Sequence, residues 1–71
     1  MNVVGPQVKW LREQKAMTQE DLTAQCNLLG WNISRGTLAK VESQVRRVTD
    51  SEVALLAEAL EVDISTLFEK T

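Results

Sequence analysis

The sequence predicts an all-α fold, a compact bundle of about five short helices forming a single domain over residues 1–71. Apolar residues recur at helical spacing, and no stretch alternates for long enough to indicate a strand. Helix start and stop signals divide the chain at short intervals. A length of 71 residues with 44% hydrophobic and 25% charged side chains suits one small globular core. Helices this short are marginal alone in water, so each must pack against the others.

The first two helices are predicted from their start signals and their apolar faces. Pro6 suits the first turn of a helix, where the missing N–H is not needed. Thr18 is a good N-cap for the second helix, with Asp21 in the reciprocal capping-box position and Gly30 as the C-terminal stop. The expected buried residues are Val4, Val8 and Leu11 in the first helix and Leu22, Cys26 and Leu29 in the second.

The third helix, over about residues 34–43, has an unusual beginning. Ser34 is its expected N-cap, and Leu38 and Val41 form its apolar side. Its first turn also holds Arg35 and Gly36, although a glycine inside a helix costs roughly 1 kcal/mol relative to alanine. A glycine kept at that cost needs a structural or functional reason.

The last two helices follow the same logic. Thr49 and Glu52 repeat the capping-box spacing at the start of the fourth helix. Asp63 is expected to cap a short last helix that carries Leu67 and Phe68. The apolar face of the fourth helix is expected to consist of Val53, Leu56, Ala57 and Leu60.

Charge is unevenly distributed along the chain. The net charge is −2, which weakly opposes a nucleic-acid partner. Residues 35–47, however, hold four basic side chains and one acidic, whereas residues 48–71 hold six acidic and one basic. A local positive stretch favours polyanion binding more than the total charge opposes it, and a merely solvated face is the alternative.

Several function classes are disfavoured. One cysteine and no histidine exclude an internal disulfide and a Cys/His zinc site, and they fit a reducing compartment. No nucleophile stands with a base and the carboxylates are dispersed, so we expect no catalysis, no metal and no cofactor. Cys26 is expected to be a small buried hydrophobic side chain. We recognise neither a signal peptide nor a membrane span, so a cytoplasmic location is expected.

Three segments in order resemble the phage repressor/Cro-type helix-turn-helix family, often called the xenobiotic-response-element family. They are MTQEDL, TLAKVE and ALEVDISTLF, and the resemblance runs from about Val4 to Phe68. It implies a lambda-repressor-like fold with the helix-turn-helix over about residues 18–43. It further implies a sequence-specific regulator of transcription, a repressor, that binds double-stranded DNA. A bacterial or phage protein associated with the nucleoid is implied as well.

The resemblance implies which residues read the bases. Arg35, Gly36 and Lys40 match positions that face base edges, and Arg35 can fork onto a guanine. Gly36 removes a side chain where helix and groove approach most closely, although relief of packing against Trp31 is the alternative. Thr37, on the flank, can reach a phosphate or a thymine methyl. The full set of residues expected at DNA is Gln19, Ser34, Arg35, Gly36, Thr37, Lys40, Arg46 and Arg47.

The resemblance also implies phosphate contacts and a structural pair. Gln19 matches a glutamine that braces the DNA backbone at the start of the second helix. Arg46 and Arg47 are expected to clamp phosphates from the loop after the third helix, with a solvated basic loop as the alternative. Arg12 and Glu42 match positions that pair across the first and third helices, and we expect them to be structural.

The chain departs from the family between the second and third helices. Asn27 stands where the family usually has glycine, and Thr23 replaces a small residue, usually alanine. The residues LLGWN form an insertion of about five. We expect an extra turn on the second helix, with Trp31 and Ile33 folded back against the body of the domain.

Two functions remain open at this level. The first is a DNA-binding regulator that acts as a homodimer through the C-terminal residues Ile64, Leu67 and Phe68, with Trp31 as a further candidate. The second is a protein-interaction module or antitoxin-like adaptor that keeps the fold without reading DNA.

Trp10 is expected to be half exposed, either on its own helix or at a subunit contact.

Overall fold

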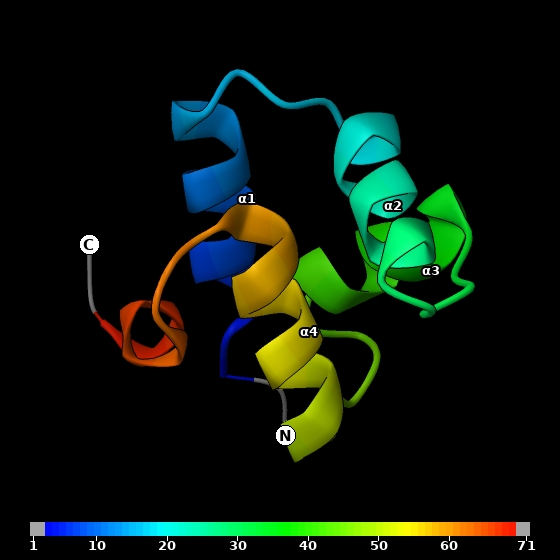
Figure 1. The fold of residues 1–71 in the computed structure, drawn as a ribbon. Helices are drawn as coiled ribbons and strands as arrows, with labels where there is room; N and C mark the ends of the chain where they lie inside the picture. The colour runs from blue at the N-terminus through cyan, green and yellow to red at the C-terminus, as the bar shows by residue number, and fades with distance from the viewer. Residues whose placement is uncertain (1–2, 70–71) are drawn as a thin grey trace.

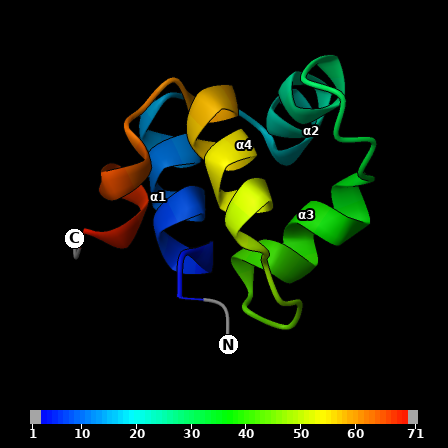
Figure 2. The ribbon, with the colours of Figure 1, turned by 60° about the horizontal axis from the view of Figure 1, so that its bottom comes forward.

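The computed structural model describes residues 3–69, which form four α-helices and a final 3₁₀ helix (Figure 1). The helices are α1 (Gly5–Gln14), α2 (Gln19–Leu28), α3 (Arg35–Glu42), α4 (Asp50–Leu60) and η1 (Ile64–Phe68). No strand occurs within residues 3–69, which confirms the predicted all-α class. Helix α4 packs against α1, α2 and η1, and α3 packs against α1 and α2 (Figures 1 and 2).

Three of the helices begin at the predicted capping residues. At α2 the Thr18 hydroxyl accepts from the Asp21 N–H at 3.0 Å, while the Thr18 N–H donates to the Asp21 carboxylate at 2.9 Å. Thr49 and Glu52 make the same reciprocal pair at α4, at 3.2 and 3.0 Å. At α3 the Ser34 hydroxyl accepts a first-turn backbone N–H at 3.1 Å. These caps satisfy backbone N–H groups that have no partner inside the helix.

The four α-helices end alike, but the sequence predicted such an end only for α2. A left-handed residue follows each α-helix, and these residues are Ala16, Gly30, Gln44 and Glu61. After α2 the Trp31 N–H donates to the Cys26 carbonyl at 3.0 Å, the hydrogen-bond pattern of a Schellman motif. Gly30, at φ +93°, adopts this conformation without steric cost, so the predicted stop is confirmed. The other three residues carry a Cβ, and each incurs a local cost of roughly 1–2 kcal/mol.

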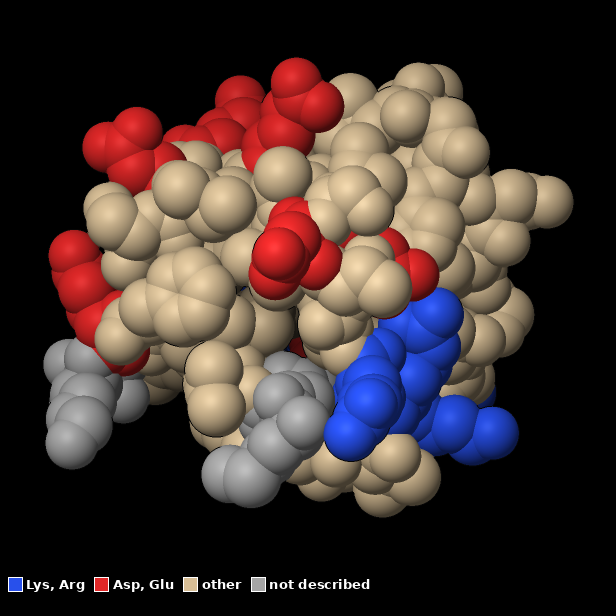
Figure 3. All heavy atoms as spheres, turned by 90° about the horizontal axis from the view of Figure 1, so that it is seen from below, with Lys and Arg blue, Asp and Glu red and all other residues tan. Residues whose placement is uncertain are grey.

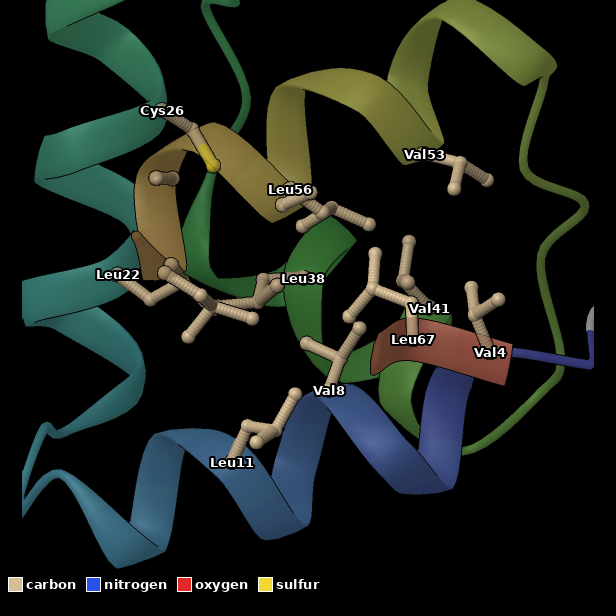
Figure 4. Packing of buried hydrophobic residues seen from close by; sticks show 13 residues of the cluster. Val4, Val8, Leu11, Leu22, Cys26, Leu38, Val41, Val53, Leu56 and Leu67 are labelled. Carbon is tan, nitrogen blue, oxygen red and sulfur yellow. The ribbon is translucent and has the colours of Figure 1, made fainter. Parts of the chain in front are cut away.

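One apolar cluster joins all the elements (Figure 4). The predicted stripes of α1 and α4 are buried, and so are Leu22 and Cys26 of α2. Burial raises the pKa of the Cys26 thiol to about 11, so the group is a neutral thiol at physiological pH. The buried hydrophobic residues are Val4, Val8, Leu11, Leu22, Cys26, Leu38, Val41, Val53, Leu56, Ala57, Ala59, Leu60 and Leu67.

The connection between α2 and α3 differs in part from the prediction. Helix α2 ends at Leu28, one residue past Asn27, so the predicted extra turn is wrong. Leu29 is 37% exposed, because the chain leaves the helix there and Trp31 covers the core in its place. Trp31 and Ile33 pack against the core as predicted, and the Asn27 side-chain amide donates to both of their carbonyls.

The last element is a 3₁₀ helix without the predicted side-chain cap. Asp63 makes no capping bond through its carboxylate; the turn closes instead when the Thr66 N–H donates to the Asp63 backbone carbonyl at 2.9 Å. The buried Gln7 side chain of α1 donates to the Thr66 carbonyl at 3.0 Å and so ties η1 to α1. None of the helices within residues 3–69 is both long and apolar enough to cross a bilayer.

Candidate nucleic-acid interface

Helix α3 is anchored on one side and open to solvent on the other (Figure 2). Leu38 and Val41 are fully buried and hold the helix against the core. The opposite side presents Arg35, Gly36 and Lys40, all exposed, with the half-buried Thr37 on the flank. Ser34, also exposed, begins the helix, and its hydroxyl lies 3.1 Å from that of Thr37. The structure therefore brings the predicted base-facing residues together on one accessible surface.

Gly36 has open space where a side chain would be. A Cβ built on Gly36 would approach only the Ser34 hydroxyl, at 3.8 Å. That is an ordinary van der Waals distance, so no atom of Trp31 prevents a larger residue. Relief of packing against Trp31 is therefore wrong as a reason for the glycine.

A buried ion pair fixes α3 against α1. The Arg12 guanidinium donates to both carboxylate oxygens of Glu42, at 2.7 and 3.2 Å, and to the Met17 carbonyl at 2.8 Å. The Arg12 and Glu42 side chains are only 10% and 3% exposed. The pair implied by the resemblance is thus present, and a bidentate geometry with buried partners sets the position of α3 closely.

Gln19 connects this pair to the exposed face of α3. Its amide NH₂ donates to Glu42 at 3.0 Å. Because a carboxylate only accepts, this bond orients the Gln19 carbonyl oxygen toward Arg35, whose guanidinium lies 3.4 Å away. In the free protein Gln19 therefore serves the protein's own network, and its expected phosphate contact would have to be made beside these bonds.

The two arginines of the loop after α3 differ in their surroundings. Arg46 donates to both carboxylate oxygens of Glu52, at 3.2 and 3.1 Å, and to the Arg47 carbonyl. Arg47 is exposed. Figure 3 shows basic side chains gathered at one edge of the molecule, while most acidic side chains lie toward the opposite edge. The predicted phosphate contacts of Arg46 and Arg47 stay a prediction, but the two residues are not equivalent, since Arg46 is already paired with Glu52 in the cap of α4.

The Arg46–Glu52 pair predicts a sensitivity to acid. Hydrogen bonds from Arg46 hold the pKa of the Glu52 carboxyl below its usual value of 4.5. Because the pKa of Glu52 is lower in the folded state than in the unfolded state, the ionised carboxylate stabilises the fold at pH values above the unfolded-state pKa. This contribution to stability is lost as pH falls below about 4.5. Melting temperatures measured between about pH 6 and pH 3 should fall less steeply for Glu52→Gln than for wild type. Glu58→Gln, an exposed change on the same helix, should follow wild type; equal slopes for all three proteins would contradict the prediction.

The C-terminal surface is smaller than expected. Leu67 is fully buried in the core, so its predicted place in a subunit contact is wrong. The residue turns inward because η1 packs on both α1 and α4. Ile64 and Phe68 are 48% and 57% exposed, and Trp10 is half exposed as predicted.

One hollow, beside the exposed face of α3, is lined in part by Lys9, a residue that no sequence pattern had indicated. It has a volume of about 200 Å³ and lies where α1, the start of α2 and the end of α3 meet. Its lining residues are Lys9, Gln19, Ala39, Glu42 and Ser43. Lys9 was missed because its neighbours in the sequence carry no binding motif.

Within residues 3–69 no group of His, Cys, Asp or Glu side chains has the arrangement of a metal site.

Two adjacent helices, the second buried on one side and basic on the other, define a helix-turn-helix domain. A family model described as Helix-turn-helix matches residues 8–67, which is most of the chain. The protein therefore belongs to the Cro-type helix-turn-helix family, also called the xenobiotic-response-element family. Comparisons with curated proteins and with solved structures each found no match. Members of this family are DNA-binding transcription regulators and not typically enzymes, which gives the general class of this protein.

Proposed function

We propose that the protein binds a specific double-stranded DNA sequence with α3 in the major groove and represses transcription by occupying that site. The observation that carries this proposal is the exposed face of α3, where Arg35 and Lys40 flank the bare backbone of Gly36. The major groove admits an α-helix and displays a distinct donor and acceptor pattern for each base pair. An arginine at the leading end of the helix fits the paired acceptors of guanine.

Phosphate contacts supply the remaining binding energy in this proposal. Arg47 is the exposed cation of the loop after α3, and Arg46 stands beside it with part of its charge engaged by Glu52. Ser34 and Thr37 offer hydroxyls at the start of α3, where backbone N–H groups also favour an anion. Contacts of this kind set the register of the protein on DNA and make its affinity salt-dependent.

We further propose that two copies bind together. One module of this size makes few base contacts, and two copies on half-sites about 34 Å apart would supply enough. The exposed Ile64 and Phe68 support a contact between copies near the C-terminal end of the described chain. Nucleoid association in a bacterial or phage system accompanies the proposed function.

Selection from a random pool of DNA duplexes tests the proposal directly. We expect recovery of a defined site that binds more tightly than a scrambled duplex and loses affinity steeply between low and physiological salt. A two-fold symmetric site with half-sites about 10 bp apart would support two copies, and an asymmetric site would contradict them. If no sequence is enriched, DNA reading is overturned and the alternative of a protein-interaction module remains.

Gly36→Ala separates the role in the groove from the role in folding. Because the added methyl group approaches only the Ser34 hydroxyl, at an ordinary contact distance of 3.8 Å, helix propensity should raise stability by about 0.5–1 kcal/mol. At about 4–8 °C per kcal/mol, thermal melting should report a rise of a few degrees. Affinity for the selected site should fall about tenfold or more, on the order of one lost base contact. A stabilised variant with unchanged affinity would remove Gly36 from the interface.

A further inference from the structure

The hollow where α1, the start of α2 and the end of α3 meet adjoins the exposed face of α3. Arg35, Ala39 and Ser43 are spaced four residues apart and therefore form one row along the helix. Ala39 and Ser43 line the hollow, so the row leads from the proposed base-reading end directly to it. A helix lying in the major groove has a phosphate backbone on either side, so a hollow at the end of this row is a candidate contact with one of these backbones.

The chemistry of the hollow suits an anion although the acidic residue Glu42 is among its lining residues. The Glu42 carboxylate is only 3% exposed, and Arg12 neutralises it with two hydrogen bonds. Gln19 donates a further hydrogen bond to it. The other charged residue that lines the hollow is Lys9, which is exposed and carries a positive charge.

The remaining polar group is the Ser43 hydroxyl. It donates to the Lys40 carbonyl at 3.3 Å, which is a long hydrogen bond at an exposed position. Such a bond is readily exchanged for one to a phosphate oxygen, which is a stronger acceptor. The volume of about 200 Å³ equals several waters of about 30 Å³ each, so a phosphate group with some of its water can enter.

We infer that this hollow binds one phosphate of the DNA backbone, with Lys9 as its cation and the Ser43 hydroxyl as a second donor. The inference rests on the proposed function and adds to it a contact from α1, a helix outside the helix-turn-helix. Its consequence is that α1 as well as α2 and α3 sets the angle at which the domain lies on DNA. A phosphate contact of this kind orients the protein without reading sequence.

The salt dependence of binding tests the inference with matched variants. Binding to the selected duplex is measured from about 50 to 200 mM salt for wild type, Lys9→Gln and Lys15→Gln. Each neutralised phosphate contributes about 0.9 to the slope of log affinity against log salt. Lys9→Gln should therefore reduce the slope by about 1, whereas Lys15→Gln, an exposed change at the end of α1, should not. Equal slopes for Lys9→Gln and wild type would overturn the inference.

Neutral phosphate substitution then locates the contact and does not depend on how a variant folds. Duplexes carrying a methylphosphonate at one backbone position at a time are bound to wild-type protein and to Lys9→Gln. We expect one position where the substitution weakens wild type but no longer weakens Lys9→Gln. If the methylphosphonate weakens binding of wild type and of Lys9→Gln by the same factor at every position, the inference is overturned. That result would leave the reading of DNA sequence unaffected. Failure of wild type to select any duplex is a separate result, which overturns the proposed function.

Discussion

Replacing Glu42 with alanine is expected to lower the free energy of unfolding by about 3–5 kcal/mol. The reason is that Arg12 would keep a buried positive charge with only the Met17 carbonyl and little solvent to stabilise it. Gln19 would lose its acceptor at the same time. A domain of 71 residues has a total stability of roughly 4–11 kcal/mol at 0.05–0.15 kcal/mol per residue, so much of the margin would disappear.

Circular dichroism during thermal and denaturant unfolding measures this loss. The matched control is the double variant Arg12→Met with Glu42→Leu, which replaces both charges by apolar groups of similar length. It should recover most of the stability, because the main cost of the single change is the unpaired charge and not the missing attraction. Glu20→Ala, an exposed acidic change on α2, should melt close to wild type. A melting temperature of Glu42→Ala equal to that of wild type would show that the pair does not brace α3.

The beginnings of the helices were readable from the sequence because the signals are local. Thr18 with Asp21 and Thr49 with Glu52 each place an acceptor and a carboxylate three residues apart, and the structure uses both pairs as predicted. The ends were harder to read. Glu61 takes a left-handed conformation without being glycine, because the packing of η1 against α4 dictates the turn between them.

The sequence predicted which residues lie at the candidate site, but it did not predict which other residues they contact. Exposure of Arg35 and Lys40 follows from the helical spacing of Leu38 and Val41, which a sequence displays directly. Whether a cation is already engaged depends on residues from other elements, and a charge count cannot show it. Arg46 counted as a positive charge in the loop, yet it lies against Glu52 of α4.

Two further errors have the same origin. Leu67 was assigned with Ile64 and Phe68 to a subunit contact, but α1 and α4 together enclose it. Lys9 has no motif around it, and its proposed role follows only from the fold, in which it lines the same hollow as Ser43, a residue far along the chain. Positions set by long-range packing are the ones that local patterns fail to predict.

Replacing Arg35 with alanine is expected to weaken binding to the selected duplex by roughly 10- to 100-fold, equivalent to about 1–3 kcal/mol for one bidentate contact to a base. Stability should change little, because the side chain is exposed and its one intramolecular bond to Gln19 is long, at 3.4 Å. That weak bond also keeps the guanidinium near the surface of α3 and is easily given up to a guanine.

Arg47→Ala is the matched control for this variant. Arg47 is an exposed arginine in the loop beyond α3, where we propose a phosphate contact. Its loss should weaken binding to specific and scrambled duplexes alike and reduce the salt slope by about 1. Loss of Arg35 should weaken the specific complex alone and relax the preference at one base pair. Fluorescence anisotropy with both duplexes at two salt concentrations measures the difference. Equal losses on the two duplexes for Arg35→Ala would mean that this residue contacts the backbone, and that the leading end of α3 does not read the sequence.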